Sequence, residues 1–111
     1  MRGVDAAARI DAPAAVRIVE FDGDDDGYLD WLAVYPDGYV VNARRKRSPD
    51  YVVLHRATCG SISNRMVEPG AYTARGYVKY CGETLADVAI VPTLCGRPRG
   101  SFTKRCGFCK P

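Results

Sequence analysis

Two short motifs that lie far apart in the sequence contain the residue types best suited to bind a metal ion. The first is LHRATC, in which His55 stands four residues before Cys59, and the second is RCGFCKP, in which Cys106 and Cys109 form a Cys-x-x-Cys knuckle. Structural zinc sites use four tetrahedral nitrogen and sulfur ligands. A tight turn lets both knuckle sulfurs reach one ion, and a helical turn would bring positions i and i+4 to the same side. The sequence therefore predicts a closed His/Cys3 site for structural zinc.

The other cysteines leave alternatives open. Cys81 and Cys95 have no partner at short spacing, so we expect buried thiols, although either could replace His55 as a ligand. The knuckle could also be a redox pair, or its thiols could be inert. Five cysteines is an odd number, which does not favour a disulfide framework. Lys104 and Arg105 stand beside the knuckle and would help to keep its thiolates deprotonated.

Basic residues are concentrated in the part of the chain that carries these motifs. Up to Asp30 there are eight acidic residues and three arginines, a charge of −5, whereas from Trp31 onward thirteen basic residues face five acidic ones, a charge of +8. A surface of this kind favours a polyanionic partner such as DNA or RNA. The residues predicted to contact phosphates are Arg44, Arg45, Lys46, Arg47, Arg97, Arg99, Lys104 and Arg105.

Tyrosines are interspersed with the basic residues: Tyr39, Tyr51, Tyr77 and Tyr80. Aromatic rings next to cations can stack on bases. The alternative is that they pack on strands and keep their hydroxyl groups in water. No RRM submotif, KH loop or repeated zinc finger is present, so the type of nucleic acid stays open.

The acidic run DGDDDG has the spacing of a calcium loop only in part. Asp22, Asp24, Asp26 and Asp30 occupy ligand positions, but Ala33 stands where a bidentate glutamate is required. A helix N-terminus explains the acids better. These acidic residues could instead bind magnesium and cleave a nucleic acid, but their spacing does not favour a nuclease. The only histidine is a metal ligand and four ligands leave no open position, so a binding module is favoured over an enzyme.

These motifs require a scaffold of strands and helices. Alternating or continuous apolar residues predict strands at residues 15–21, 38–43, 51–56 and 76–81. Helices are expected at about residues 25–35, before the turn Pro36-Asp37-Gly38, and at residues 83–91, where Pro92 would end the helix. The remaining tail is rich in glycine and proline and is expected to be a loop. The fold class is α+β: a short, mainly antiparallel sheet, two short helices and the C-terminal knuckle.

Length and composition predict one soluble domain. The chain has 111 residues, of which 47% are hydrophobic and 26% charged, and no apolar run approaches a membrane span. Residues 1–14 are expected to be a flexible lead-in and residues 15–111 a single zinc-binding domain. Asp5, Arg9 and Asp11 interrupt the apolar stretch that a secretion signal needs, so we expect a cytoplasmic protein.

The sequences PDGYVVN, LHRATC and CGFCKP, within residues 20–111, together resemble a small zinc-binding domain of actinobacterial proteins. In that family a PxGYVxN strand precedes a strand ending in LHRAxC, and the knuckle reads CGxCxP. Some members are joined to restriction-type nuclease domains. The pattern is also similar to metal-binding segments of DNA-repair and nuclease-associated proteins. The resemblance implies a bacterial zinc module with the same four ligands. We therefore expect a zinc-stabilised nucleic-acid-binding module, with a protein–protein adaptor as the alternative and a small metal-dependent nuclease as a weaker one.

Overall fold

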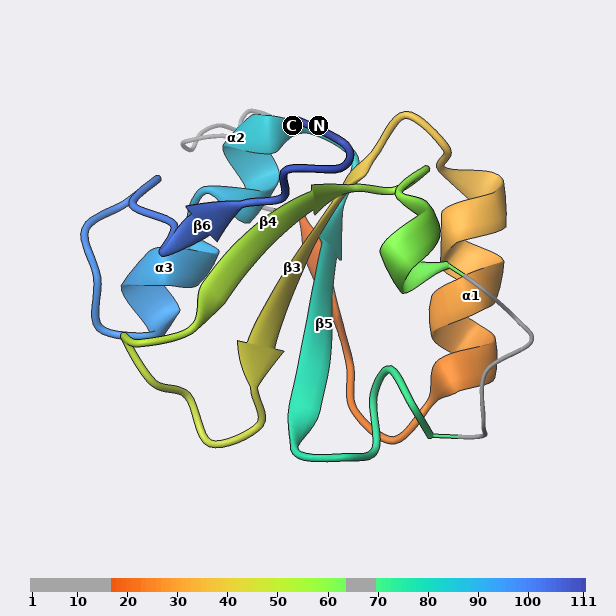
Figure 1. Ribbon diagram of the computed structural model, residues 1–111, viewed down its shortest axis with the longest axis horizontal. Coiled ribbons are helices and arrows are strands. Elements are labelled where there is room, and N and C mark those ends of the chain that lie inside the picture. The colour runs from red at the N-terminus through yellow and green to blue at the C-terminus, as the bar shows by residue number, and fades with distance from the viewer. Residues whose placement is uncertain (1–16, 64–69) are drawn as a thin grey trace, which may run out of the picture.

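A five-stranded sheet runs through the centre of the computed structural model, which describes residues 17–63 and 70–111 (Figure 1). The order of strands in the sheet is β2-β5-β3-β4-β6. All neighbouring pairs are antiparallel except β4 and β6, which are parallel. The strands are β2 (Ile18–Phe21), β3 (Tyr39–Arg44), β4 (Val52–Arg56), β5 (Tyr77–Gly82) and β6 (Lys104–Arg105).

Helices cover both faces of this sheet. In Figure 1, α1 and the 3-10 helix η1 lie on one side of the sheet, and the short helices α2 and α3 lie on the other. The mainly antiparallel sheet and the helices confirm the predicted α+β class. The bounds of the helices are α1 (Asp25–Val34), η1 (Gly60–Ile62), α2 (Leu85–Val88) and α3 (Val91–Leu94).

The strands carry nearly continuous apolar sequence because both faces of the sheet are buried. Successive side chains of a strand point to opposite faces. Val40 therefore packs with Tyr28 of α1, while Val41 packs with Val88 and Val91 of α2 and α3. The core is thus divided into two layers by the sheet, and the cysteines Cys59 and Cys106 of the motifs predicted to bind metal belong to the α1 layer.

The acidic run before α1 serves the start of the helix, as expected. Asp24 is the N-cap, and its carboxylate accepts a hydrogen bond from the backbone N–H of Gly27 at 2.9 Å. Asp25 accepts hydrogen bonds from the Thr73 backbone N–H and hydroxyl at 2.8 and 2.6 Å. Asp22 forms an ion pair with Arg45 at 2.7 Å. These acids therefore have structural partners.

Two expectations for the C-terminal part were wrong. The single helix predicted at residues 83–91 is two one-turn helices, and Pro92 stands in the first turn of α3 instead of ending a helix. Proline is tolerated there because the first turn needs no intrahelical N–H donor. The tail is also not all loop, since residues 104–105 form β6 against the edge of β4. Local sequence does not reveal this pairing because its partner lies far away in the chain.

The predicted lead-in at residues 1–14 lies outside the described residues, as do positions 15 and 16 of the first predicted strand. Across residues 17–63 and 70–111, every helix falls short of the length and hydrophobicity that crossing a membrane would require.

Candidate metal centre

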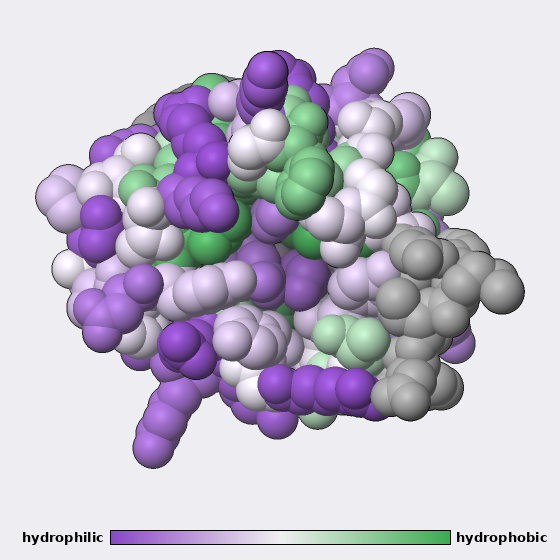
Figure 2. All heavy atoms as spheres, viewed as in Figure 1, coloured by the Kyte–Doolittle hydropathy of each residue, from purple (hydrophilic) through white to green (hydrophobic). Residues whose placement is uncertain are grey.

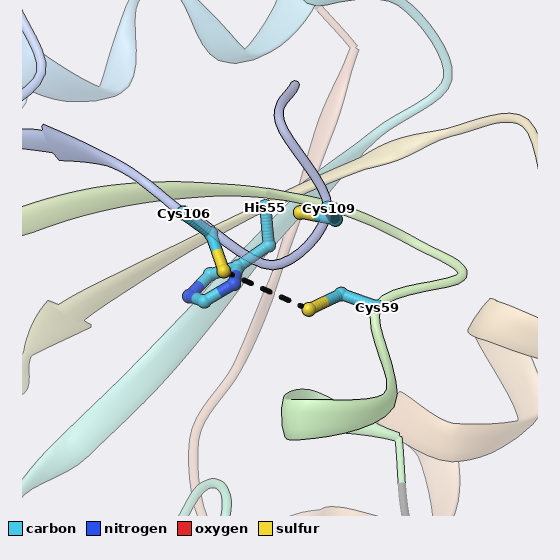
Figure 3. Close-up of side chains that lie close together, drawn as sticks. All are labelled: His55, Cys59, Cys106 and Cys109. Atoms are coloured by element: carbon cyan, nitrogen blue, oxygen red, sulfur yellow. Dashed lines mark hydrogen bonds between the residues drawn. The ribbon is translucent and has the colours of Figure 1, made fainter.

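The four side chains predicted to bind metal come together at one end of the sheet (Figure 3). His55, Cys59, Cys106 and Cys109 each offer one ligand atom, and these atoms lie within 4.8 Å of one another. The sulfurs of Cys59 and Cys106 are 3.8 Å apart. Tetrahedral zinc with Zn–S bonds of about 2.3 Å places two sulfurs about 3.8 Å apart. This arrangement could hold a metal ion.

The strand register directs His55 into the cluster. His55 lies opposite Val40, whose side chain belongs to the α1 layer of the core. Cys59 follows β4 through a turn in which its backbone N–H donates to the carbonyl of Arg56 at 3.0 Å. The expectation that a helical turn joins His55 to Cys59 is therefore wrong. A strand end followed by a tight turn brings them together instead.

The edge strand β6 brings the knuckle to the same place. Leu54 of β4 lies opposite Arg105 of β6, and the Cys106 N–H donates to the Leu54 carbonyl at 2.9 Å. Cys106 therefore follows the parallel register to a position beside His55. The backbone N–H of Lys110 then donates to the carbonyl of Cys106 at 2.9 Å, which closes the knuckle.

His55 has the properties of a neutral metal ligand. Its side chain is buried, and Nδ1 has no hydrogen-bond partner among the described residues. Burial, with the positive charges of Lys79 and Lys104, lowers the pKa of His55 to about 4. A buried nitrogen without a partner costs about 1–3 kcal/mol. A metal ion bound to this imidazole would remove that cost.

The three thiols do not ionise independently. Burial raises the pKa of Cys106, but the backbone amides of Cys109 and Phe108 and the neighbouring thiols outweigh it, so the net shift is downward. Burial raises the pKa of Cys109 to about 11. The neighbouring thiols also raise it, whereas the hydrogen bond from the Arg56 amide opposes the rise. One thiolate is thus stabilised by amides, whereas further negative charges need a cation close by. The donor set therefore fits a divalent cation.

Two residues that support the centre were not predicted from the sequence. Arg56 donates its backbone N–H to the Cys109 sulfur at 3.2 Å, and its guanidinium donates to the carbonyls of Cys109 and Lys110 at 3.0 and 3.2 Å. The hydroxyl of Ser61 lies 3.0 Å from the Cys59 sulfur. The only sequence signal for these two residues is that they lie close to the candidate ligands in the chain. The contact of Arg56 with the C-terminal tail depends on the fold.

Cys81 and Cys95 stand apart from the cluster. Both are free, buried thiols, and neither belongs to the group that could hold a metal. Burial raises the pKa of each thiol, with a nearby cation, Lys79 or Arg47, opposing the shift. The four-residue set with His55 is therefore the one that the fold assembles.

Side-chain hydrogen bonds within the described structure engage five of the eight predicted phosphate-binding residues: Arg45, Arg47, Arg97, Arg99 and Arg105. Besides its ion pair with Asp22, Arg45 donates to the carbonyl of Thr73 at 3.3 Å. Arg47 donates to the Tyr80 hydroxyl at 2.9 Å. Arg97 donates to Pro49 and Ser101, and Arg99 donates to the carbonyl of Ala86. These contacts give Arg45, Arg47, Arg97 and Arg99 structural roles.

The basic residues Arg44, Lys46, Lys104 and Arg105 meet no acidic side chain among the described residues. The guanidinium of Arg44 lies 5.3 and 5.7 Å from the ring centres of Tyr51 and Tyr77. Arg105 donates to the Pro111 carbonyl at 3.2 Å. The side chains of Lys46 and Lys104 are exposed and form no hydrogen bond with the described residues. These two lysines are therefore the cations of the set with no side-chain partner in the described structure.

The predicted tyrosines serve the fold as well as the surface. Tyr51 accepts a hydrogen bond from Asn42 at 3.2 Å, and Tyr80 accepts one from Arg47. The guanidinium of Arg56 lies 6.0 Å from the ring centre of Tyr39. Tyr80 is buried, which confirms strand packing there, whereas Tyr39, Tyr51 and Tyr77 are half-buried.

Comparison with known proteins supplies no relative from which a function could be transferred. Neither a protein-family model, nor a curated protein, nor a solved structure matches this chain.

Proposed function

We propose that this protein is a zinc-stabilised module that binds nucleic acid, DNA in the first instance, through the basic edge of its sheet. The zinc ion would be architectural. Its ligands come from β4, the turn after it and the C-terminal knuckle, so the ion would fasten the tail to the sheet. Four protein ligands leave no position for a substrate, which favours binding over catalysis.

The chemistry of the donor set supports zinc over hard cations. Three thiols and one imidazole are soft ligands, and such ligands select zinc over magnesium or calcium. The 3.8 Å separation between the Cys59 and Cys106 sulfurs suits a tetrahedral ion. Free thiols are kept reduced in the cytoplasm, which is where we propose that the protein acts.

The observation that carries the nucleic-acid proposal is the meeting of two basic groups that are far apart in the sequence. Residues 44–47 lie in the loop between β3 and β4, and residues 97–105 lead into β6, which pairs with β4. Arg97 joins the two segments by donating to the carbonyl of Pro49 at 2.9 Å. Arg45 and Arg47 turn toward Asp22 and Glu20 on the β2 side, but the end of this loop and the segment that leads into β6 meet at the β4–β6 edge of the sheet. Such an edge suits a phosphate backbone.

The test is binding of fluorescein-labelled duplex DNA, single-stranded DNA and RNA by zinc-loaded protein, measured by anisotropy at several salt concentrations. We expect binding that weakens with salt, by about 0.9 log unit per tenfold salt for each duplex phosphate contact. Lys46→Ala and Lys104→Ala should each lower that slope. The matched control is Arg17→Ala, which removes one charge next to β2, at the opposite edge of the sheet.

Absence of salt-dependent binding, or equal effects of Lys46→Ala and Arg17→Ala, would overturn the proposed surface. Retention on an immobilised acidic protein without nucleic-acid binding would favour the adaptor function. Degradation of plasmid DNA with magnesium or manganese would favour a nuclease.

A further inference from the structure

A pocket of about 490 Å³ opens beside the metal centre. Its lining includes Tyr51 and Val53 from the β4 side, His55 and Cys106 from the metal centre, and Lys104 and Phe108 from the C-terminal segment. The face seen in Figure 2 is largely hydrophilic, with a central hollow where hydrophobic atoms are visible. The volume lies in the range of pockets that bind small organic groups. We call it the knuckle pocket.

The knuckle pocket is more than the space that the metal ion itself would occupy. Only His55 and Cys106 of the four ligands line it, whereas Cys59 and Cys109 do not. A tetrahedral ion needs only the space within about 2.3 Å of its sulfurs. The wall formed by Tyr51, Lys104 and Phe108 therefore surrounds room for a second, larger group.

Phe108 is the most exposed large hydrophobic residue among those described. It stands inside the Cys-x-x-Cys turn, and 88% of its surface is accessible. Removing the apolar surface of a phenylalanine ring from water is favourable. An aromatic ring presented in this way at the wall of a pocket offers a flat face to another planar group.

The cations around the pocket determine the charge of its ligand. Lys104 lines the pocket and meets no acid among the described residues. The Arg44 guanidinium lies 5.3 Å from the centre of the Tyr51 ring, which connects the pocket with the basic loop at residues 44–47. An aromatic ring beside cations matches a planar ligand that carries negative charge. A base with its phosphate has both features.

We infer that the knuckle pocket takes one unpaired base of a single-stranded nucleic acid, which stacks on Phe108 while Lys104 and Arg44 contact the adjoining phosphates. This inference rests on the proposed function and restricts the nucleic acid that the pocket binds to single strands. Paired bases are stacked within a duplex and do not present a free face, so the pocket would distinguish single strands from duplexes.

The experiment compares zinc-loaded wild type with Phe108→Ala and Phe108→Leu, using labelled oligo(dT) and a blunt duplex of equal length. Loss of one stacking contact is worth about 1–3 kcal/mol, which corresponds to a fall in affinity of about 5- to 150-fold. We expect this fall for oligo(dT) in both variants, with duplex affinity unchanged. Phe108→Trp should retain binding, and its added fluorescence should be quenched by oligo(dT). Val34→Ala, an exposed apolar residue on α1, is the control.

The zinc content of every variant is measured in parallel, and only variants with the wild-type content are compared. Wild-type affinity for oligo(dT) in Phe108→Ala, or in Phe108→Leu, would overturn stacking on the ring. In that case salt-dependent binding by the wild type would still support the proposed function. Failure of the wild type to bind either probe would overturn both.

Discussion

At the scale of single residues, His55 and Lys79 are buried polar side chains with different surroundings. The Nδ1 atom of His55 has no partner among the described residues. The ammonium of Lys79 donates to the Asn42 side chain and to the Tyr72 carbonyl, both at 2.8 Å, and lies within 6 Å of the Tyr28 and Tyr72 ring centres. Lys79 is thus satisfied by the protein itself, whereas His55 has the features of a group that binds a ligand.

Replacement of a ligand should remove the metal. We expect Cys59→Ser and Cys106→Ser to lose the zinc that the wild type retains after purification, because a serine hydroxyl is a poor substitute for a thiolate. Cys95→Ala is the matched control, since this thiol is buried outside the cluster. Mass spectrometry of metal content gives the measurement. Equal zinc in all variants would contradict the assignment of ligands.

Lys79 should make stability depend on pH. Burial lowers its pKa from 10.5 to about 8, opposed by Asp25 and Cys81. The charged form is disfavoured in the folded protein, so a cost on the order of 3 kcal/mol applies below pH 8 and disappears as the pH rises toward 10.5. Urea unfolding should therefore show that wild type gains stability over this range relative to Lys79→Met.

The comparison with Lys79→Met isolates the lysine from the other groups around it. The raised pKa of Cys81 acts in the opposite direction in both proteins, and the tyrosines Tyr28 and Tyr72 face the lysine in both. Lys46→Met, at an exposed site, is the control and should follow the wild-type curve. Parallel curves for wild type and Lys79→Met would show that the lysine has no such effect.

At the scale of elements, the most important contact for the site is between β4 and the short strand β6. Thr103 donates its backbone N–H to Val52 at 2.8 Å and accepts from the Val52 N–H at 2.9 Å through its hydroxyl. The backbone N–H of Cys106 adds a second backbone–backbone hydrogen bond to β4, to the carbonyl of Leu54. A two-residue strand is too short to be stable alone. A metal ion bound by the candidate ligands that flank it on both strands would therefore add to its stability.

The join between β5 and α2 should tolerate no added methyl group. A Cβ atom at Gly82 would lie 2.9 Å from Val88 Cγ1 and 3.0 Å from Asp87 Cβ. We expect Gly82→Ala to lower the free energy of unfolding by about 1–3 kcal/mol, because overpacking displaces α2. Gly60→Ala is the control, since nothing lies within 4 Å of a Cβ there. Equal urea midpoints for the two variants would contradict this packing.

At the scale of the whole molecule, the candidate metal centre joins the middle of the chain and its C-terminal segment to one core. Cys59 and Cys106 pack in the same layer as Tyr28 and Leu29 of α1. Structural zinc contributes about 10–16 kcal/mol of apparent binding free energy in small peptides. Domains of this size are stable by only about 5–15 kcal/mol. The proposed zinc would therefore account for much of the stability of the fold.

Removal of the metal should unfold the C-terminal half of the protein. We expect a strong chelator to abolish much of the near-UV circular dichroism and to expose the amides of residues 103–106 to hydrogen exchange, because these residues pair with β4 beside the cluster. Addition of zinc should reverse both changes. Unchanged near-UV dichroism and exchange after complete chelation would contradict an architectural role.

Much of the candidate centre could be predicted from the sequence because its information is local. The spacing of Cys106 and Cys109 is that of a tight metal-binding turn, and His55 stands only four residues before Cys59, so that a single turn can bring the two side chains together. The apolar pattern of the strands likewise reflects burial on the sheet, and Asp24 at the start of α1 is a local signal for a helix cap. These features depend on neighbouring residues alone.

What only the tertiary structure decided are the contacts between distant segments. Residues far apart in the chain meet in four such features: the pairing of β6 with β4, the surroundings that bury Lys79, the ion pair of Arg45 and the pocket beside Phe108. No short pattern specifies such partners, because they depend on strand register and on which surfaces the whole fold buries. The sequence by itself determined the ligand types and their two half-sites; the register of the folded sheet determined that they meet.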